Sequence, residues 1–228
     1  MGASSVILPR VRMSAPLPFR HLAIEGPIGV GKTSLTGLLA KRFRGTKILN
    51  DVENPFLDDF YNARPGAALQ AQLFYLLNRH RQQLAVRQAD LFAQATVCDY
   101  LFDKDKIFAY LNLDDNELFI YQRLFDLLSK DVAAPDLVIY LQAPTDVLIE
   151  RLRRRPADPE RAAADPAEPY LRELNEAYQH FFFHYTSTPL LVVETSQIDL
   201  EGSDDALDNL IRQIRTMNRG TRYYVPRP

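Results

Sequence analysis

The chain has 228 residues, 46% of them hydrophobic, which is enough for one sizeable α/β domain. Its 27 lysines and arginines are balanced by 29 aspartates and glutamates, which excludes the strongly basic surface typical of nucleic-acid-binding proteins. The single cysteine excludes an internal disulfide framework, and no apolar run approaches the roughly 18 residues that a membrane span requires. We therefore expect a cytoplasmic protein without a nucleic-acid or membrane partner.

Residues 1–20 precede the first predicted element. They contain three arginines and no acid, as organelle transit peptides do. Their prolines, however, would break the amphipathic helix that such a peptide needs. The composition therefore favours a disordered lead-in over a targeting peptide.

From residue 21 onward, the hydrophobic pattern predicts strands that alternate with helices. The predicted strands are 21–25, 46–53, 95–99, 136–143 and 189–195. The predicted helices are 32–43, 65–87, 116–131, 145–155, 170–185 and 203–217. This alternation predicts an α/β fold with a five-stranded parallel sheet flanked by helices. We expect a single domain over residues 21–217, followed by a C-terminal tail at 218–228.

The segment at about 155–169 is rich in proline, alanine and charged residues. It is followed by a helix of the same sheet, which argues against an interdomain linker. Its size and composition are typical of a mobile lid over an active site.

The segment EGPIGVGKTS, residues 25–34, carries the most specific motif. Its G-x-x-x-x-G-K-[ST] pattern lies between a predicted strand and a predicted helix. In this pattern, backbone N–H groups surround phosphates, the lysine reaches the β and γ oxygens, and the threonine hydroxyl binds Mg²⁺. We therefore predict that ATP binds, with Mg²⁺, to Gly26, Gly29, Val30, Gly31, Lys32, Thr33 and Ser34.

Two carboxylates end predicted strands, and the carboxyl edge of a parallel sheet is where open α/β folds bind ligands. Asp99 ends the third strand, and a carboxylate at that place typically binds Mg²⁺. Glu53 ends the second strand among apolar residues, and a desolvated carboxylate can serve as a general base. The pattern around Glu53 fits equally well a carboxylate that stabilises a helix N-terminus.

Gln72 and Arg79 are seven residues apart in the predicted helix 65–87 and therefore share one of its faces. An amide and a guanidinium on one face could bind the edge of a base, although polar residues at this spacing are more often solvated. Five arginines adjoin the predicted lid and fit either phosphoryl transfer or a solvated helix end: Arg151, Arg153, Arg154, Arg155 and Arg161.

Taken together, these segments resemble the deoxyribonucleoside kinase family, and most of all its bacterial deoxyadenosine and deoxyguanosine kinases, over nearly all of 21–215. The stretches that carry the resemblance occur in the family's order: IEGPIGVGKTSL, ENPFLDDFY, LQAQLFYLLNRHRQQL, CDYLFDKDKIFA, LVIYLQAPTDVLIERLRRR and YLRELNEAY. The first is shared by all phosphate-loop proteins, whereas the combination is far more specific. The resemblance implies a P-loop nucleoside kinase fold with a helical lid.

The resemblance also implies roles for residues of the nucleoside site. Glu53 matches the general base that takes the proton from the 5′-hydroxyl of the sugar, and Tyr61 matches a tyrosine that binds the 3′-hydroxyl. Gln72 matches the glutamine that binds the base, and Arg79 an arginine that sets base preference. Asp99 matches an acidic residue that contacts both the magnesium site and the sugar.

In the predicted lid, Arg151 and Arg155 match arginines that clamp the transferring phosphates, and Glu160 matches a glutamate that contacts the sugar. The chain departs from the family pattern at two places. Tyr100 and Leu101 replace the Arg and Ser that follow the acidic residue, and Lys104 could supply the missing cation. In the lid, Pro156 and Ala157 replace a Gly and a second Arg, which leaves the lid one arginine short.

These observations predict transfer of the γ-phosphate of ATP to the 5′-hydroxyl of a deoxynucleoside, with a purine base favoured. The first alternative is a nucleoside monophosphate kinase of the thymidylate kinase type. The acids around Glu53, which include Asp51, Asp58 and Asp59, would repel a phosphorylated acceptor. The second alternative is a non-catalytic P-loop binding protein. By analogy with the family, we also expect a homodimer, with the apolar helix 114–131 as one contact surface.

Overall fold

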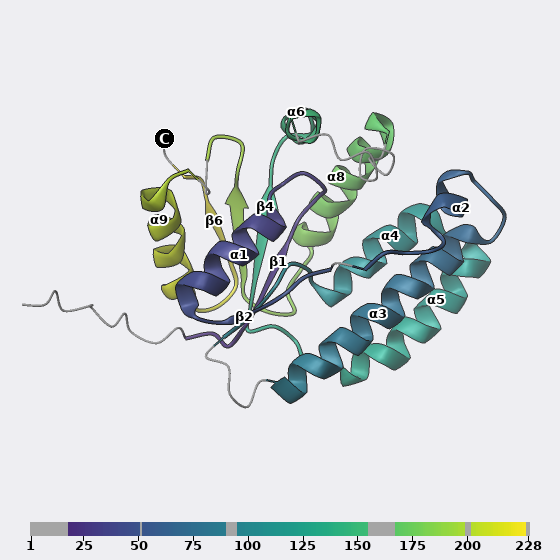
Figure 1. Ribbon diagram of the computed structural model, residues 1–228, viewed down its shortest axis with the longest axis horizontal. Coiled ribbons are helices and arrows are strands. Elements are labelled where there is room, and N and C mark those ends of the chain that lie inside the picture. Colours follow the sequence, from purple (N-terminus) through teal and green to yellow (C-terminus); the bar gives the residue numbers. More distant parts are fainter. Residues whose placement is uncertain (1–17, 51, 90–94, 155–166, 199–201, 227–228) are drawn as a thin grey trace, which may run out of the picture.

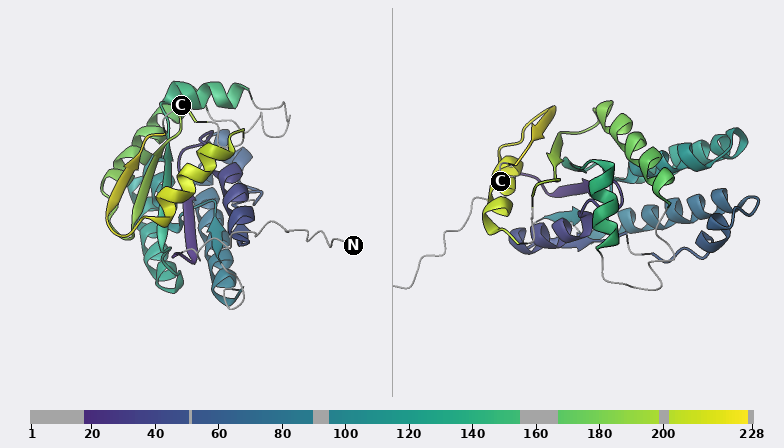
Figure 2. Two further views of the ribbon diagram at one scale, coloured as in Figure 1. Left: turned by 90° about the vertical axis from the view of Figure 1, so that its left-hand side faces the viewer. Right: turned by 90° about the horizontal axis from the view of Figure 1, so that it is seen from above.

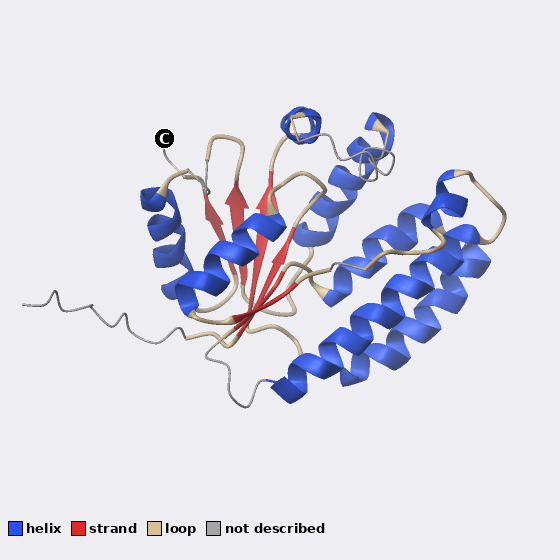
Figure 3. Ribbon diagram, viewed as in Figure 1, coloured by secondary structure: helices blue, strands red, loops and turns tan. Residues whose placement is uncertain are grey.

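The computed structural model describes residues 18–50, 52–89, 95–154, 167–198 and 202–226. These residues form a parallel sheet with helices on both faces, which confirms the predicted α/β class (Figures 1 and 3). The strands, in their order across the sheet, are β2 (Thr46–Ile48), β3 (Thr96–Cys98), β1 (His21–Glu25), β4 (Leu137–Gln142), β5 (Leu190–Glu194) and β6 (Thr221–Tyr224). The helices are α1 (Lys32–Phe43), α2 (Leu57–Tyr61), α3 (Ala67–Ala89), α4 (Asp105–Asn112), α5 (Asp115–Leu128), α6 (Thr145–Arg153), α8 (Glu168–Phe183) and α9 (Asp204–Arg215).

The central strands form because their sequences are apolar on both sides, as parallel strands covered on two faces require. In β4, for example, the five residues from Leu137 to Leu141 are all buried. Residues of β1 pair with both β3 and β4, so β1 lies at the centre of the sheet. Because the chain passes to β2 and β3 on one side of β1 and to β4 on the other, the carboxyl end of β1 is the topological switch point where such folds bind ligands.

The two faces of the sheet are covered by different helices (Figure 2). One face packs against α1 and α9, whose buried leucines include Leu39 and Leu210. The opposite face packs against α8, where the ring of Phe182 stacks on Tyr140 of β4 with centroids 4.1 Å apart. These two cores hold the sheet edge that bears the loops after β1 and β3.

A third layer of helices extends away from the sheet, with α3 and α5 side by side (Figures 1 and 2). Its core includes Leu76 of α3 together with Tyr121 and Phe125 of α5. The helix α5 begins with a capping box, in which Asp114 accepts the backbone N–H of Glu117. Among the described residues, no helix is both long and apolar enough to cross a membrane.

The structure corrects two predictions about the strands. The sheet has six strands rather than five, because residues 221–224, which we had placed in the tail, pair in parallel with β5. The second strand ends at Ile48 and does not reach Glu53, because the backbone N–H of Asn50 donates to the side chain of Asp99 instead of continuing the ladder. Most of the predicted lid, including Arg155, Pro156, Ala157, Glu160 and Arg161, lies outside the described residues.

Candidate active site

The segment between β1 and α1 forms a tight glycine loop at the carboxyl end of β1. Gly26, Gly29 and Gly31 have φ angles of 153°, 88° and 101°, in a region that side-chain-bearing residues rarely adopt. A Cβ atom on Gly26 would also collide with the backbone oxygen of Leu141. The loop thus adopts the conformation that the sequence pattern requires for backbone N–H groups to surround an anion at the start of α1.

Lys32 is the first residue of α1, and its side chain folds back over the glycine loop. Its Nζ donates to the backbone oxygens of Gly26 at 2.7 Å and Pro27 at 3.1 Å. The ammonium group therefore lies where phosphates held by the loop would be. The helix α6 packs on the same loop, since Ile28 contacts Ile149 and Leu152.

Thr33 and Asp99 lie next to each other at the sheet edge. The Thr33 Oγ1 donates to Asp99 Oδ2 at 3.0 Å, and the other carboxylate oxygen accepts the backbone N–H of Asn50 at 2.6 Å. Mg²⁺ prefers hard oxygen ligands and usually takes one or two protein oxygens together with phosphate oxygens and water. The hydroxyl and carboxylate oxygens of this pair fit that preference.

A cavity of about 290 Å³ opens beside this pair, close to the lower limit of volume for small-molecule sites. It brings together seven residues singled out in the sequence: Lys32, Thr33, Tyr61, Gln72, Arg79, Asp99 and Lys104. Glu53 is exposed and is not among the described residues that line the cavity, although Asn50 and Leu57 on either side of it are.

Gln72 and Arg79 also line this cavity, and both side chains are buried. Gln72 Nε2 donates to the backbone oxygen of Asp105 at 2.9 Å. The guanidinium of Arg79 forms an ion pair with the Asp105 carboxylate, and its Nε donates to Asn50 Oδ1 at 3.1 Å. Burial lowers the pKa of Arg79, while the carboxylate of Glu25 opposes that change.

Asp105 is a residue that the sequence analysis missed. Its side chain is fully buried, contacts Arg79 and accepts the hydroxyl of Tyr121 at 3.0 Å. Asp105 lies six residues after Asp99 in the segment DKDK, residues 103–106, where its charged neighbours give no local sign that it is buried. Its pairing with Arg79 follows from its burial, because a buried carboxylate requires a counter-charge.

Glu25 is a second residue that was missed. This fully buried carboxylate accepts the N–H groups of Gly26 at 2.9 Å and Leu101 at 2.8 Å, and the hydroxyl of Tyr178 at 3.1 Å. It thereby joins the glycine loop to the segment after β3. The Nζ of Lys104, which also lines the cavity, lies 4.0 Å from the Glu25 carboxylate.

Replacing Lys104 with methionine should change how the stability of the ligand-free protein depends on pH. Burial lowers the folded-state pKa of Lys104 to about 7 from 10.5, against the opposing effect of Glu25. Between these values the unfolded chain binds one more proton here than the folded chain. The wild type should therefore gain up to about 1.4 kcal/mol of unfolding free energy per pH unit relative to the variant.

Urea denaturation from about pH 6 to about pH 9 measures this difference. Near and below pH 7 the folded lysine is also protonated, so its contribution to the pH dependence disappears and its destabilising effect is greatest. The other charged groups that face Lys104, namely Arg79, Lys32 and Asp99, are present in both proteins. Parallel pH profiles for wild type and Lys104→Met would show that Lys104 keeps an ordinary pKa.

Arg151 on α6 lies outside the cavity. Its guanidinium donates to Thr195 Oγ1 at 3.0 Å and to the backbone oxygen of Thr195, in the loop after β5. Arg153 and Arg154 form exposed ion pairs with Glu168 and Glu150. The structure therefore favours the solvated interpretation for these two arginines.

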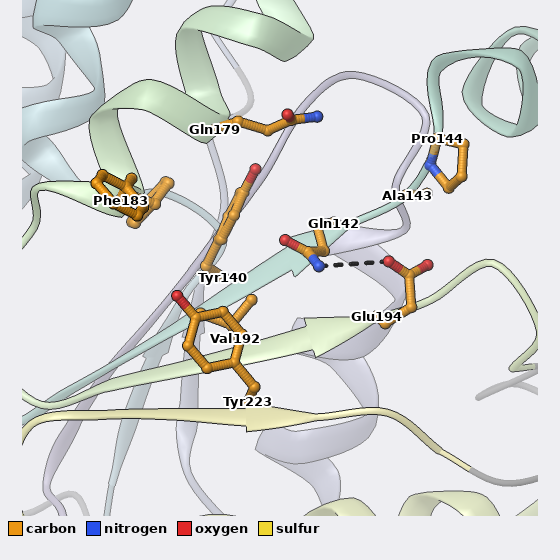
Figure 4. A pocket seen from close by; sticks show the side chains of 10 residues that line it. Tyr140, Gln142, Ala143, Pro144, Gln179, Phe183, Val192, Glu194 and Tyr223 are labelled. Atoms are coloured by element: carbon orange, nitrogen blue, oxygen red, sulfur yellow. Dashed lines mark hydrogen bonds between the residues drawn. The ribbon is translucent and has the colours of Figure 1, made fainter.

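A second cavity of about 370 Å³ lies at the carboxyl ends of β4 and β5, on the face that α8 covers (Figure 4). Its walls include Tyr140, Phe183 and Tyr223, and Gln142 Nε2 donates to Glu194 Oε2 at 3.4 Å. Among the described residues, its lining includes none of the residues singled out in the sequence. We therefore assign the candidate active site to the cavity beside the glycine loop.

The glycine loop at the switch point, the folded-back lysine and the adjoining polar cavity define a phosphotransferase of the P-loop class. Residues 22–218 match the deoxynucleoside kinase family, and the chain belongs to that family. The matched segment contains all of the described helices and, apart from His21 and strand β6, all of the described strands.

Several characterised relatives are similar to the chain. Deoxyguanosine kinase of Bacillus subtilis is 34% identical over 139 residues, which cover 59% of this chain and 66% of that enzyme. Deoxyadenosine kinase of Dictyostelium discoideum is 35% identical over 167 residues, covering 71% and 66%. The chain thus aligns with just under two thirds of the length of these two relatives. Deoxyadenosine/deoxycytidine kinase of B. subtilis is 24% identical over 205 residues, covering 86% and 92%.

Among solved structures, deoxyadenosine kinase from M. mycoides with bound dATP has a TM-score of 0.67 and 22% identity, over 84% of this chain and 98% of that one. At this level of identity, the likeness shows that the two proteins share a fold.

Proposed function

We propose that this deoxynucleoside kinase transfers the γ-phosphate of ATP to the 5′-hydroxyl of a purine deoxynucleoside and releases the monophosphate and ADP. The observation that carries the proposal is the cavity beside the glycine loop. It is lined both by the pair of Thr33 and Asp99, next to the glycine loop, and by the buried polar side chains of Gln72 and Arg79. A nucleoside placed between them would have its sugar near the phosphates and its base on the buried polar groups.

In the proposed reaction, Lys32 and the backbone N–H groups of the glycine loop bind the β- and γ-phosphates. Thr33 and Asp99 would hold Mg²⁺, which, when bound with ATP, neutralises charge that develops during transfer. Arg151 and Arg155 would add positive charge at the transferring group. The position of Arg151 on α6, the helix that packs on the glycine loop, supports this role.

We propose that Glu53 is the general base and that Tyr61 and Glu160 bind the sugar. Support for Glu53 comes from its neighbours in the chain, since the cavity-lining residues Asn50 and Leu57 flank it. Tyr61 itself lines the cavity. An apo structure often shows catalytic groups away from their productive positions, so an exposed Glu53 is compatible with this role.

The choice of a purine rests on the names of the relatives and on the two polar groups that would bind the base. Because Gln72 donates its Nε2 to Asp105, its carbonyl oxygen is left to accept a hydrogen bond from an exocyclic amine. Arg79 carries only donors, which match the O6 and N7 acceptors of guanine. A site that leaves these buried groups unpaired with the wrong base should discriminate strongly.

The test of the base preference is a panel of the four common deoxynucleosides, each assayed with ATP and Mg²⁺. We expect kcat/KM for deoxyadenosine or deoxyguanosine to exceed the values for thymidine and deoxycytidine by at least about tenfold. Chromatographic detection of each monophosphate measures the rates directly. Equal or faster phosphorylation of either pyrimidine would overturn the purine preference.

We also propose that the protein is a cytoplasmic homodimer. The helix α5 exposes Phe119, Ile120 and Leu127, and Ile120 and Leu127, seven residues apart, share a face that a second copy could cover. Sedimentation of the purified protein at micromolar concentration tests the assembly. A dimer that Leu127→Lys dissociates is the expected result, and a wild-type monomer would contradict it.

A further inference from the structure

Asn50 lines the cavity but takes no part in the reaction proposed above. It lies two residues after β2 and lines the cavity together with Asp99 and Arg79. Its backbone N–H donates to Asp99 Oδ1 at 2.6 Å, while its side-chain oxygen accepts Arg79 Nε at 3.1 Å. One residue therefore contacts both Asp99, which would hold Mg²⁺, and Arg79, which would bind the base.

The contact with Arg79 has a clear physical consequence. The guanidinium is buried, with one terminal nitrogen on the Asp105 carboxylate and its carbon 4.9 Å from the centre of the Tyr75 ring. Asn50 provides the acceptor for Nε, on the opposite edge of the group. Two anchors on different edges fix the plane of a guanidinium, whereas one anchor leaves it free to rotate.

These contacts form a continuous series across the site. Thr33, in the first turn of α1, donates to Asp99, Asp99 accepts from Asn50, and Asn50 accepts from Arg79. Arg79 in turn pairs with Asp105. The series spans the distance between the group that would hold Mg²⁺ and the group that would bind the base.

We propose that Asn50 is a positioning residue that fixes the Arg79 guanidinium for base selection. This inference rests on the proposed function, because it assigns Asn50 a task within the same site. The side chain of Asn50 acts through Arg79, while its backbone N–H serves Asp99. Substitution of the side chain therefore loosens Arg79 and leaves the contact to Asp99 in place.

Gln82 offers a matched control. It lies on the same helix as Arg79, and its Nε2 donates to the backbone oxygen of Leu49 at 3.3 Å. Gln82 thus holds the same segment after β2 without lining the cavity. A variant that only loosens this segment is Gln82→Ala, and a variant that only releases Arg79 is Asn50→Ala.

The test compares kcat and KM for a purine and a pyrimidine deoxynucleoside in wild type, Asn50→Ala, Gln82→Ala, Arg79→Lys and the double variant Asn50→Ala/Arg79→Lys. We expect Asn50→Ala to reduce the purine-to-pyrimidine ratio of kcat/KM by about tenfold, mostly through a higher KM for the purine. Gln82→Ala should keep the wild-type ratio. In the Arg79→Lys background, which lacks Nε, Asn50→Ala should change the ratio by less than about twofold.

The variants require a folding control, and their kinetics can contradict the role of Asn50 in three ways. Thermal unfolding of each variant shows whether it is folded, and Arg79→Lys keeps a cation beside Asp105. An unchanged ratio in Asn50→Ala, an equal loss in Gln82→Ala, or an undiminished effect in the Arg79→Lys background would overturn the role of Asn50. A wild-type protein that phosphorylates no deoxynucleoside would instead overturn the proposed function, and the inference with it.

Discussion

Replacing Asp105 with alanine should lower the free energy of unfolding by about 3–5 kcal/mol, which is the cost of removing one partner of a buried ion pair. The side chain of Asp105 is fully buried, and that of Arg79 is nearly so. The substitution leaves the guanidinium without its counter-charge and removes the acceptor for the Tyr121 hydroxyl. Urea denaturation of the ligand-free protein measures the loss.

The control for this prediction is an ion pair on the surface. Asp146 pairs with Arg172 at 2.8 Å, and both side chains are largely exposed. Exposed pairs contribute from about 0 to 1 kcal/mol, so Asp146→Ala should change stability little. Equal losses of unfolding free energy in Asp105→Ala and Asp146→Ala would show that the buried pair stabilises the protein no more than an exposed pair does.

Replacing Glu53 with glutamine should lower kcat by about 10²- to 10⁴-fold, the usual range for loss of a general base. Glutamine has the shape of glutamate but cannot take the proton from the 5′-hydroxyl. Because the base and sugar contacts are retained, the dissociation constant of the deoxynucleoside should change by less than about threefold. Steady-state kinetics and calorimetric titration give the two quantities separately.

Asp58→Asn is the matched control, since Asp58 is an exposed acid on the neighbouring helix α2. It removes the same charge close to Glu53 without touching the proposed base. Turnover of Glu53→Gln close to that of Asp58→Asn would remove Glu53 from the mechanism. Asp99, whose carboxylate lies in the cavity, would then be the next residue to test as the base.

The strands of the central sheet could be predicted from the sequence because a strand that is buried on both faces is a continuous apolar run. The strand β4, for example, contains LVIYLQ and is almost wholly buried. The strand β6 could not be predicted in the same way. It lies at the edge of the sheet, where Thr221 and Tyr223 are exposed, so its pattern resembles that of a tail.

The short helices α2 and α4 were also missed. They have 5 and 8 residues, and short helices depend on packing against neighbours rather than on their own sequence. The helix α4 packs on α3 and α8, two elements far from it in the chain. Its position, and with it that of Asp105, depends on contacts that no local pattern records.

At the candidate active site, local motifs predicted which side chains line the cavity, but they could not predict the partners that are distant in the sequence. The spacing of Gln72 and Arg79 placed both side chains on one face of a helix, and the structure places both in the cavity. Their roles stay predictions. The partners of Arg79 are 26 and 29 residues away, at Asp105 and Asn50, and only the fold brings them together.

The central claim is that the acceptor is the 5′-hydroxyl of a deoxynucleoside, and one measurement tests it most directly. The purified protein is incubated with ATP, Mg²⁺ and either a purine deoxynucleoside or its 5′-monophosphate at equal concentration, and ADP and both possible nucleotide products are quantified. We expect the deoxynucleoside to yield its monophosphate and ADP in equal amounts, at a rate at least about a hundredfold above that with the monophosphate. Faster conversion of the monophosphate to a diphosphate, or ADP release at the background rate with every deoxynucleoside, would contradict the account.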